Sequence, residues 1–482
     1  MQLISARFFA FLAVTFIFYY LCPKKHRWVI LSGFSLAFYA FSGYVSLIFI
    51  LINSLSSYAF ALCLQKCRKE GSGFAQKANL TSAVTFTVCL WAFSRAMEAH
   101  PLGISFYSLR VISYLFEVKR GRLRAQRNFL KYLLFTAFFP ISVLGPIAEY
   151  GKISDSLFSG KGTDGKGFLS GLIRLLWGIF KKCVIANLLS EPLSKIYGNP
   201  DSFSGAYILF LLIFYSAEIY CDFSGGIDIA LGVSGMLGVD LPENFNRPFA
   251  SRNLREFWNR WHITLGEWFE KYVFYPLSLS KPMQRLSKLC RRRLGVTVGK
   301  RIPVYTATLL TWLLTGLWHG ARWNFVAWGL INGILVVLSQ EMSFVSERFY
   351  EKHPSVKGDG VILTSCARAR VFLIIGAVRL LDVYKSPKLT AKQLGTVFYD
   401  VESYKSFFGG GLFALINVPA LLILSVALIA VFFVSATRTE SRDIAEKPMC
   451  SALCVFGLIL LSLVFGKYGM GFDLSDFIYS QY

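Results

Sequence analysis

Hydrophobic residues in this chain form long runs separated by short polar or charged stretches. A helix that crosses a bilayer needs about 20 mostly apolar residues, and most of the runs approach this length. We expect about eleven membrane-spanning helices, with the remaining runs re-entrant or lying in the interface, and hence an all-α polytopic membrane fold. The runs cover roughly residues 6–22, 28–42, 45–64, 80–95, 103–118, 129–147, 168–190, 205–221, 224–239, 303–318, 322–340, 369–384, 410–435 and 449–466.

Composition agrees with a membrane protein and excludes a soluble one. Of the 482 residues, 54% are hydrophobic and 16% charged, whereas a soluble globular chain carries about 25% charged residues. The net charge of +23 would suggest nucleic acid in a soluble protein. In a membrane protein, basic residues collect in the cytoplasmic loops. We therefore expect membrane lipid, and no nucleic acid, as a partner.

Basic loops predict the orientation. Three of them follow the first, third and fifth runs, which places these loops in the cytoplasm and the N-terminus outside. A further basic stretch at residues 285–301 is predicted to be a cytoplasmic loop. It is either a plain topology anchor or a site that attracts an anionic lipid headgroup or acyl donor. The three loops contain Lys24, Lys25 and Arg27; Lys66, Arg68, Lys69 and Lys77; and Lys119, Arg120, Arg122, Arg124 and Arg127.

Proline and glycine interrupt several runs, at 139–140, 145–146 and 222–226. Irregular backbone at membrane depth is tolerated only where protein buries it or where it lines a cavity, so these breaks suggest a wet interior site. The ten cysteines lie mostly inside apolar stretches. We interpret them as buried small hydrophobic residues, and we expect no metal site.

His319 is the first candidate for chemistry. It lies in an apolar, tryptophan-rich run between Gly316 and Gly320. An ionisable side chain at membrane depth is costly and usually faces a cavity. Its imidazole could act as a general base toward a hydroxyl, with the glycines leaving room for a bulky substrate. A helix-packing histidine is an equally good interpretation. Asn324 could orient the ring or donate to an oxyanion, or simply pack between helices.

His262 lies in the second candidate segment, residues 255–270, where Arg, Trp, Glu and His are dense. Phe257, Trp261, Thr264 or Leu265, and Trp268 follow helical spacing, which predicts one amphipathic helix with an aromatic face. That helix either lies in the membrane interface or forms the wall of a funnel, with Arg255 and Arg260 available to phosphates of a nucleotide-type donor.

Asp222, Ser224 and Asp228 form a third polar cluster. Two carboxylates at membrane depth could serve a proton or cation path, and hence a transporter, or could be neutralised by buried ion pairs.

Three stretches together resemble the membrane-bound O-acyltransferase family, in particular its bacterial alginate O-acetyltransferase-like branch. They are Leu-Pro-Glu-Asn-Phe-Asn-Arg-Pro-Phe at 241–249, Glu-Phe-Trp-Asn-Arg-Trp-His-Ile-Thr-Leu at 256–265, and Gly-Leu-Trp-His-Gly-Ala-Arg-Trp-Asn-Phe at 316–325. Further stretches matching that branch extend the resemblance over most of the chain.

The resemblance implies one membrane-embedded domain over 1–482, with N-terminal helices in 1–100, a catalytic core in 101–345, and C-terminal helices with an aromatic tail in 346–482. A ring of helices would surround a tunnel in which His319 and His262 are catalytic. Asn324, Arg255, Arg260, Trp318, Trp261, Asp222 and Ser224 would contact substrate. Tyr479 in the C-terminal tail could relay the acyl group, or could be an interfacial anchor.

The activity implied is transfer of an acyl group, most simply acetyl from acetyl-CoA, to a hydroxyl of an extracytoplasmic polysaccharide or of a partner protein. The implied location is the cytoplasmic membrane, no cofactor is expected to remain bound, and the expected partner is an extracytoplasmic SGNH-type acyltransferase. D-alanyl or other acyl transfer from a carrier protein to a teichoic-type polymer is the closest alternative, and a transporter is the alternative outside enzymes.

Overall fold

The structure is a computed structural model that describes residues 4–352, 360–437 and 439–468. These residues form helices and connecting loops, with one isolated β-bridge between Phe245 and Trp261. The first part of the chain contains α1 (Ala6–Leu21), α2 (Arg27–Phe41), α3 (Tyr44–Lys69), α4 (Gly73–Ala96), α5 (Ile104–Arg120), α6 (Phe129–Ala137) and α7 (Tyr150–Ser159).

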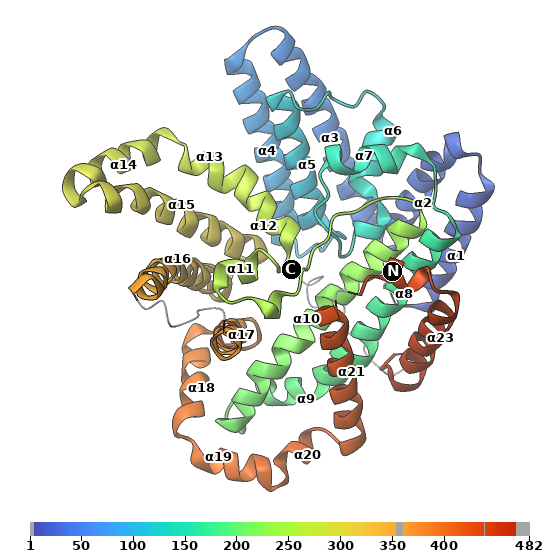
Figure 1. The fold of residues 1–482 in the computed structure, drawn as a ribbon. Helices are drawn as coiled ribbons and strands as arrows, with labels where there is room; N and C mark the ends of the chain where they lie inside the picture. Colours follow the sequence, from blue (N-terminus) through green and yellow to red (C-terminus); the bar gives the residue numbers. More distant parts are fainter. Residues whose placement is uncertain (1–3, 353–359, 438, 469–482) are drawn as a thin grey trace.

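Figure 1 shows how the central and C-terminal helices continue around the molecule. The central part contains α8 (Gly165–Phe180), α9 (Asn187–Gly198), α10 (Ala206–Met236), α11 (Leu254–Trp258), α12 (Ile263–Phe269), α13 (Tyr275–Ser278), α14 (Lys281–Leu294), α15 (Val296–His319) and α16 (Trp323–Lys352). The C-terminal part contains α17 (Val361–Tyr384), α18 (Pro387–Tyr399), α19 (Val401–Ser406), α20 (Leu412–Leu415), α21 (Val418–Thr437), α22 (Ser441–Ala445) and α23 (Pro448–Phe465).

The all-α membrane fold is confirmed. Within the described residues, six helices are long and apolar enough to cross a bilayer: α3, α10, α16, α17, α21 and α23. The apolar helix α1 and the segment Phe129–Ile141 are shorter. The number of candidate spans, six, is below the eleven expected, because several predicted runs form helices that are short or rich in polar residues.

Helix α10 corrects the prediction of a break at residues 222–226. It runs without interruption from Ala206 to Met236, where the sequence suggested two separate spans. The glycines serve helix packing instead. A Cβ on Gly225 would lie 2.8 Å from the carbonyl oxygen of Gly178, and one on Gly232 would lie 2.6 Å from that of Gly171. Helices α8 and α10 therefore approach each other closely along two glycine pairs.

The basic stretch at 285–301 is also corrected, because most of it is helical. Helix α14 folds back on α15 to form a hairpin that projects from the rest of the molecule (Figure 1). A Cβ on Gly299 would lie 2.3 Å from the backbone nitrogen of Arg291, so this glycine permits the close approach of the two helices. Counting charge along the chain indicates the side of the membrane but not whether the basic residues share a helix.

The cysteines are less buried than expected. Only Cys183, Cys221 and Cys290 are buried, and the other seven are intermediate or exposed. Apolar residues on the outer faces of membrane helices can face lipid, so an apolar neighbourhood in the sequence does not imply burial inside the protein.

Candidate functional site

His262 and His319 line the same cavity, which has a volume of about 490 Å³. One wall comes from residues 255–274, which include α11, α12 and the π-helical segment Glu270–Phe274. The other wall comes from α15 and α16. Both histidines are nonetheless nearly buried, with 4% and 7% of their surface exposed. The structure thus brings together the two histidines that the sequence singled out and gives them a common space for a ligand.

His262 lies at a break between two short helices, which corrects the prediction of one amphipathic helix over 255–270. Helix α11 ends at Trp258, α12 begins at Ile263, and His262 has a left-handed backbone with φ of 50°. The predicted aromatic face is buried rather than interfacial: Phe257 is 0% and Trp261 2% exposed. The left-handed conformation is strained for a residue other than glycine, so the surrounding contacts must hold it.

Asn244 provides those contacts. Its Oδ1 accepts hydrogen bonds from the backbone nitrogen of Thr264 at 3.1 Å and from the Thr264 hydroxyl at 2.9 Å. The backbone nitrogen of Ile263 donates to the Asn244 carbonyl oxygen at 3.0 Å. Asn244 therefore satisfies amides in the first turn of α12 from outside the helix. The sequence placed Asn244 in a family motif but gave no sign of this role.

The same oxygen fixes the protonation of the His262 ring. Nδ1 of His262 lies 3.2 Å from Oδ1 of Asn244. Because a backbone N–H also donates to Oδ1, that atom is the amide oxygen, which can only accept. Nδ1 must therefore carry the proton, and Nε2 of the neutral ring keeps the lone pair.

His319 is the last residue of α15. The Trp318 ring lies near both histidines, with centroid distances of 4.9 Å to His319 and 6.4 Å to His262. The sequence suggested that the flanking glycines leave room for a bulky substrate, but in the structure they pack against Phe325. A Cβ on Gly316 would lie 2.4 Å from the carbonyl oxygen of Phe325, and one on Gly320 would lie 2.5 Å from the Phe325 ring. They allow the start of α16 to pack beside His319.

The other predicted contact residues divide into two groups. Arg255 and Trp261 line the cavity. Arg260 and Asn324 lie outside its lining: Arg260 forms an ion pair of 2.6 Å with Glu256, and Nδ2 of Asn324 donates to the carbonyl oxygen of Leu381 at 3.3 Å. This contact agrees with helix packing, one of the interpretations of Asn324 that the sequence allowed. Tyr479 lies outside the described residues.

Asp222 and Ser224 belong to a separate buried cluster between α10 and the stretch formed by α8 and the π-helical segment Lys181–Ala186 that follows it. Lys182 Nζ lies 2.5 Å from Asp222, and Lys181 Nζ donates to Ser224 Oγ at 2.8 Å. Asp228 is paired with Lys181 and Arg174, at 2.5 and 3.1 Å. Each carboxylate is thus neutralised in a helix interface, which is the alternative that the sequence offered to a cation path.

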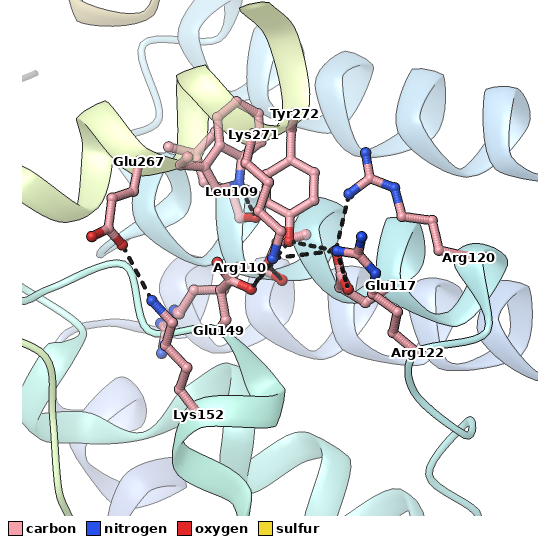
Figure 2. Close-up of polar contacts among 12 residues, drawn as sticks. Leu109, Arg110, Glu117, Arg120, Arg122, Glu149, Lys152, Glu267, Lys271 and Tyr272 are labelled. Atoms are coloured by element: carbon pink, nitrogen blue, oxygen red, sulfur yellow. Dashed lines mark hydrogen bonds and ion pairs between the residues drawn. The ribbon is translucent and has the colours of Figure 1, made fainter. Parts of the chain in front are cut away.

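A polar network, which the sequence did not reveal, supports the cavity wall from behind. Figure 2 shows Lys271 and Tyr272, from the π-helical part of the wall, directed at two carboxylates. Lys271 Nζ lies 2.6 Å from Glu149 and 3.3 Å from Glu117, and the Tyr272 hydroxyl donates to both at 3.2 and 3.1 Å. Arg120 also pairs with Glu117, at 3.2 Å. The neighbouring residues Phe269, Glu270 and Phe274 face the cavity.

Comparison with known proteins places the fold in a family. A model of the MBOAT, membrane-bound O-acyltransferase family, matches residues 31–289, which is more than half of the chain. The chain belongs to this family. The matched region of the membrane-bound O-acyltransferase includes Asn244 and His262 and ends before His319.

Similar proteins include acetyl and alanyl transferases. The chain is 35% identical to "Probable alginate O-acetylase AlgI" of Azotobacter vinelandii over 242 residues, 50% of this chain and 45% of that protein. It is 28% identical to a peptidoglycan O-acetyltransferase of Helicobacter pylori over 398 residues, 72% of each. It is 29% identical to a teichoic acid D-alanyltransferase of Bacillus subtilis, over 56% of this chain and 69% of that protein. The alignments to the alginate O-acetylases of Azotobacter vinelandii and Pseudomonas aeruginosa span less than half of those proteins.

Proposed function

We propose that this membrane-bound O-acyltransferase family member transfers an acyl group, most simply acetyl, from a cytoplasmic thioester to a hydroxyl of an extracytoplasmic polysaccharide or of a partner protein. The observation that carries the proposal is that two histidines from distant segments line one cavity. Family membership and the names of the similar proteins support the reaction class.

In this proposal His319 removes the proton from the acceptor hydroxyl. The hydroxyl oxygen attacks the thioester carbonyl, the new C–O bond replaces the C–S bond, and the proton passes to the departing thiolate. His262 helps to hold the acceptor, because its unprotonated Nε2 can accept a hydrogen bond from a hydroxyl but cannot donate one to the thioester carbonyl. The Asn324 amide, the other candidate for holding the carbonyl, already donates to a backbone carbonyl. The tryptophans that line the cavity would help to protect the thioester from water.

Arg255 is the cavity-lining residue best suited to a phosphate of the donor, because its guanidinium can make paired hydrogen bonds to phosphate oxygens. Acetyl-CoA is the donor we propose, and we propose no resident cofactor. We further propose a single domain of about eleven spans around a tunnel, location in the cytoplasmic membrane, and cooperation with an extracytoplasmic SGNH-type acyltransferase, with Tyr479 as the relay of the acyl group.

D-alanyl transfer to a teichoic-type polymer is the second candidate, because a teichoic acid D-alanyltransferase is among the similar proteins. The two reactions need the same histidines and the same cavity, and they differ in the acyl group and its carrier.

One experiment tests the proposal. Purified protein is incubated with acetyl-CoA labelled in the acetyl group, and release of free thiol is measured for wild type, His319→Ala, His262→Ala and His100→Ala. We expect both cavity variants to lose thiol release and the exposed His100 variant to keep it. Retention of wild-type turnover by His319→Ala would refute the base assignment. Turnover with an alanyl-loaded carrier protein but not with acetyl-CoA would favour the second candidate.

A further inference from the structure

A second cavity, separate from the histidine cavity, is lined almost entirely by cations. It has a volume of about 470 Å³ and is lined by Gln65, Arg68, Lys69, Arg124 and Arg127. None of these residues lines the histidine cavity. The lining carries four positive side chains and no carboxylate, so the cavity is built to attract an anion.

Two segments that are distant in the sequence form this cavity. One contribution is the end of α3, and the other is the connection between α5 and α6. The backbone nitrogen of Ala125 donates to Oε1 of Gln65 at 2.6 Å, and the Tyr58 hydroxyl donates to the carbonyl oxygen of Arg127 at 2.6 Å. These two hydrogen bonds hold the basic connection against α3. Retention of basic residues in cytoplasmic loops explains their presence in each loop, but not their convergence on one cavity.

The cations of the cavity differ from several of their neighbours, because the ion pairs of this region lie outside the cavity. Within the described part of the chain, no ion pair involves Arg68, Lys69, Arg124 or Arg127. Adjacent cations in the same two segments are paired: Lys66 with Glu70, and both Arg120 and Arg122 with Glu117. The two carboxylates of this region, Glu70 and Glu117, thus pair with basic residues outside the cavity lining and leave the cavity positive.

Size and chemistry together specify the ligand. A cavity of this volume lies within the range of about 300–1,000 Å³ that small molecules occupy, and is too small for a folded partner. Arginine presents paired donors that match the oxygens of a phosphate group. We propose that this cavity binds a ligand with two phosphate groups, whose negative charges would offset those of the four cations. The phosphates belong either to the headgroup of an anionic phospholipid at the membrane surface or to a soluble nucleotide-type molecule.

The first arm of the test measures a soluble ligand. The full chain is placed in nanodiscs of phosphatidylcholine, and inorganic pyrophosphate is titrated by calorimetry into wild type and Arg124→Gln/Arg127→Gln. Both arginines are exposed, so the variant should fold, and its thermal unfolding is checked. The control is Arg285→Gln/Arg292→Gln on α14, which removes the same charge from exposed positions elsewhere. Wild type and control should bind one pyrophosphate, and the cavity variant should bind at least about tenfold more weakly.

The second arm measures lipid. The same three proteins are placed in nanodiscs containing a doubly anionic phospholipid, and native mass spectrometry counts the lipid retained. The lipid headgroup is the source of the phosphates if wild type and control retain the lipid, the cavity variant does not, and pyrophosphate displaces it. Pyrophosphate binding without lipid retention would identify a soluble source. Equal weakening by both double variants, or saturable binding in neither arm, would overturn the proposal. Neither arm depends on acyl transfer.

Discussion

Replacing Asn244 by alanine tests how the structure orients His262. The side chain is fully buried, and its Oδ1 accepts three hydrogen bonds: one from His262 Nδ1 and two from Thr264. The substitution removes the acceptor for all three. It therefore leaves the strained backbone at His262 without its side-chain support, and it removes the contact that holds the proton on Nδ1.

The size of the effect follows from these contacts. Each neutral hydrogen bond contributes about 1 kcal/mol to folding, and a buried donor left without an acceptor costs about 1–3 kcal/mol. We therefore expect Asn244→Ala to lower the free energy of unfolding by about 3 kcal/mol. We also expect kcat for thiol release to fall between about tenfold and about a hundredfold, because a catalytic ring displaced by about 1 Å loses about a hundredfold in rate.

Thr264→Val separates stability from orientation. It removes the hydroxyl bond to Asn244 and the bond that the Thr264 hydroxyl accepts from the backbone nitrogen of Ile147 at 2.9 Å, but it leaves the contact between Asn244 and His262 in place. Thermal unfolding and kcat are measured for both variants at a temperature where each is folded. We expect similar losses of stability but a much larger loss of kcat for Asn244→Ala. Equal losses of kcat, or no loss of stability in Asn244→Ala, would refute the reasoning.

Three further predictions concern the supports of the fold. A Cβ at Gly178 would lie 2.5 Å from the Gly225 carbonyl oxygen, so Gly178→Ala should lower the free energy of unfolding by about 1–3 kcal/mol. Gly235 has open space around it, so Gly235→Ala should be neutral or stabilising by up to about 1 kcal/mol. Thermal melts in detergent compare the two variants. Lys182→Met leaves the Asp222 carboxylate in the interior and should cost about 3–5 kcal/mol, and adding Asp222→Leu should recover most of the loss; a double variant as unstable as the single one would contradict this. Glu117→Gln weakens the buried contacts to Lys271 and Tyr272 and should raise KM for the thioester, while Glu402→Gln, in an exposed pair with Lys405 away from the cavity, should leave KM unchanged. Steady-state kinetics on both variants check this, and equal effects would show that the network does not hold the wall.

The sequence was most informative where local composition decides the outcome. Long apolar runs predicted helices that the structure contains, and the family resemblance carried by the motifs around His262 and His319 predicted one tunnel for both, which line one cavity. It failed at residues 222–226, where glycine was interpreted as a break. A glycine in an apolar helix has two physical uses, a turn or a close helix contact, and only the position of α8 distinguishes them.

The break at His262 shows a different limit. Residues 255–270 have good helical periodicity, and local preference alone favours one helix. Intrahelical hydrogen bonds are lost at the break, and two asparagines from another segment replace them. Asn244 Oδ1 accepts from the Thr264 backbone nitrogen, and the Asn246 backbone nitrogen donates to the Arg260 carbonyl oxygen at 2.9 Å. The compensation comes from another segment, so no local pattern could report it. The His262 ring at this break has its backbone held by the segment around Asn244, and α15 and α16 form the opposite wall of its cavity, so an imidazole can line a cavity within a largely apolar core.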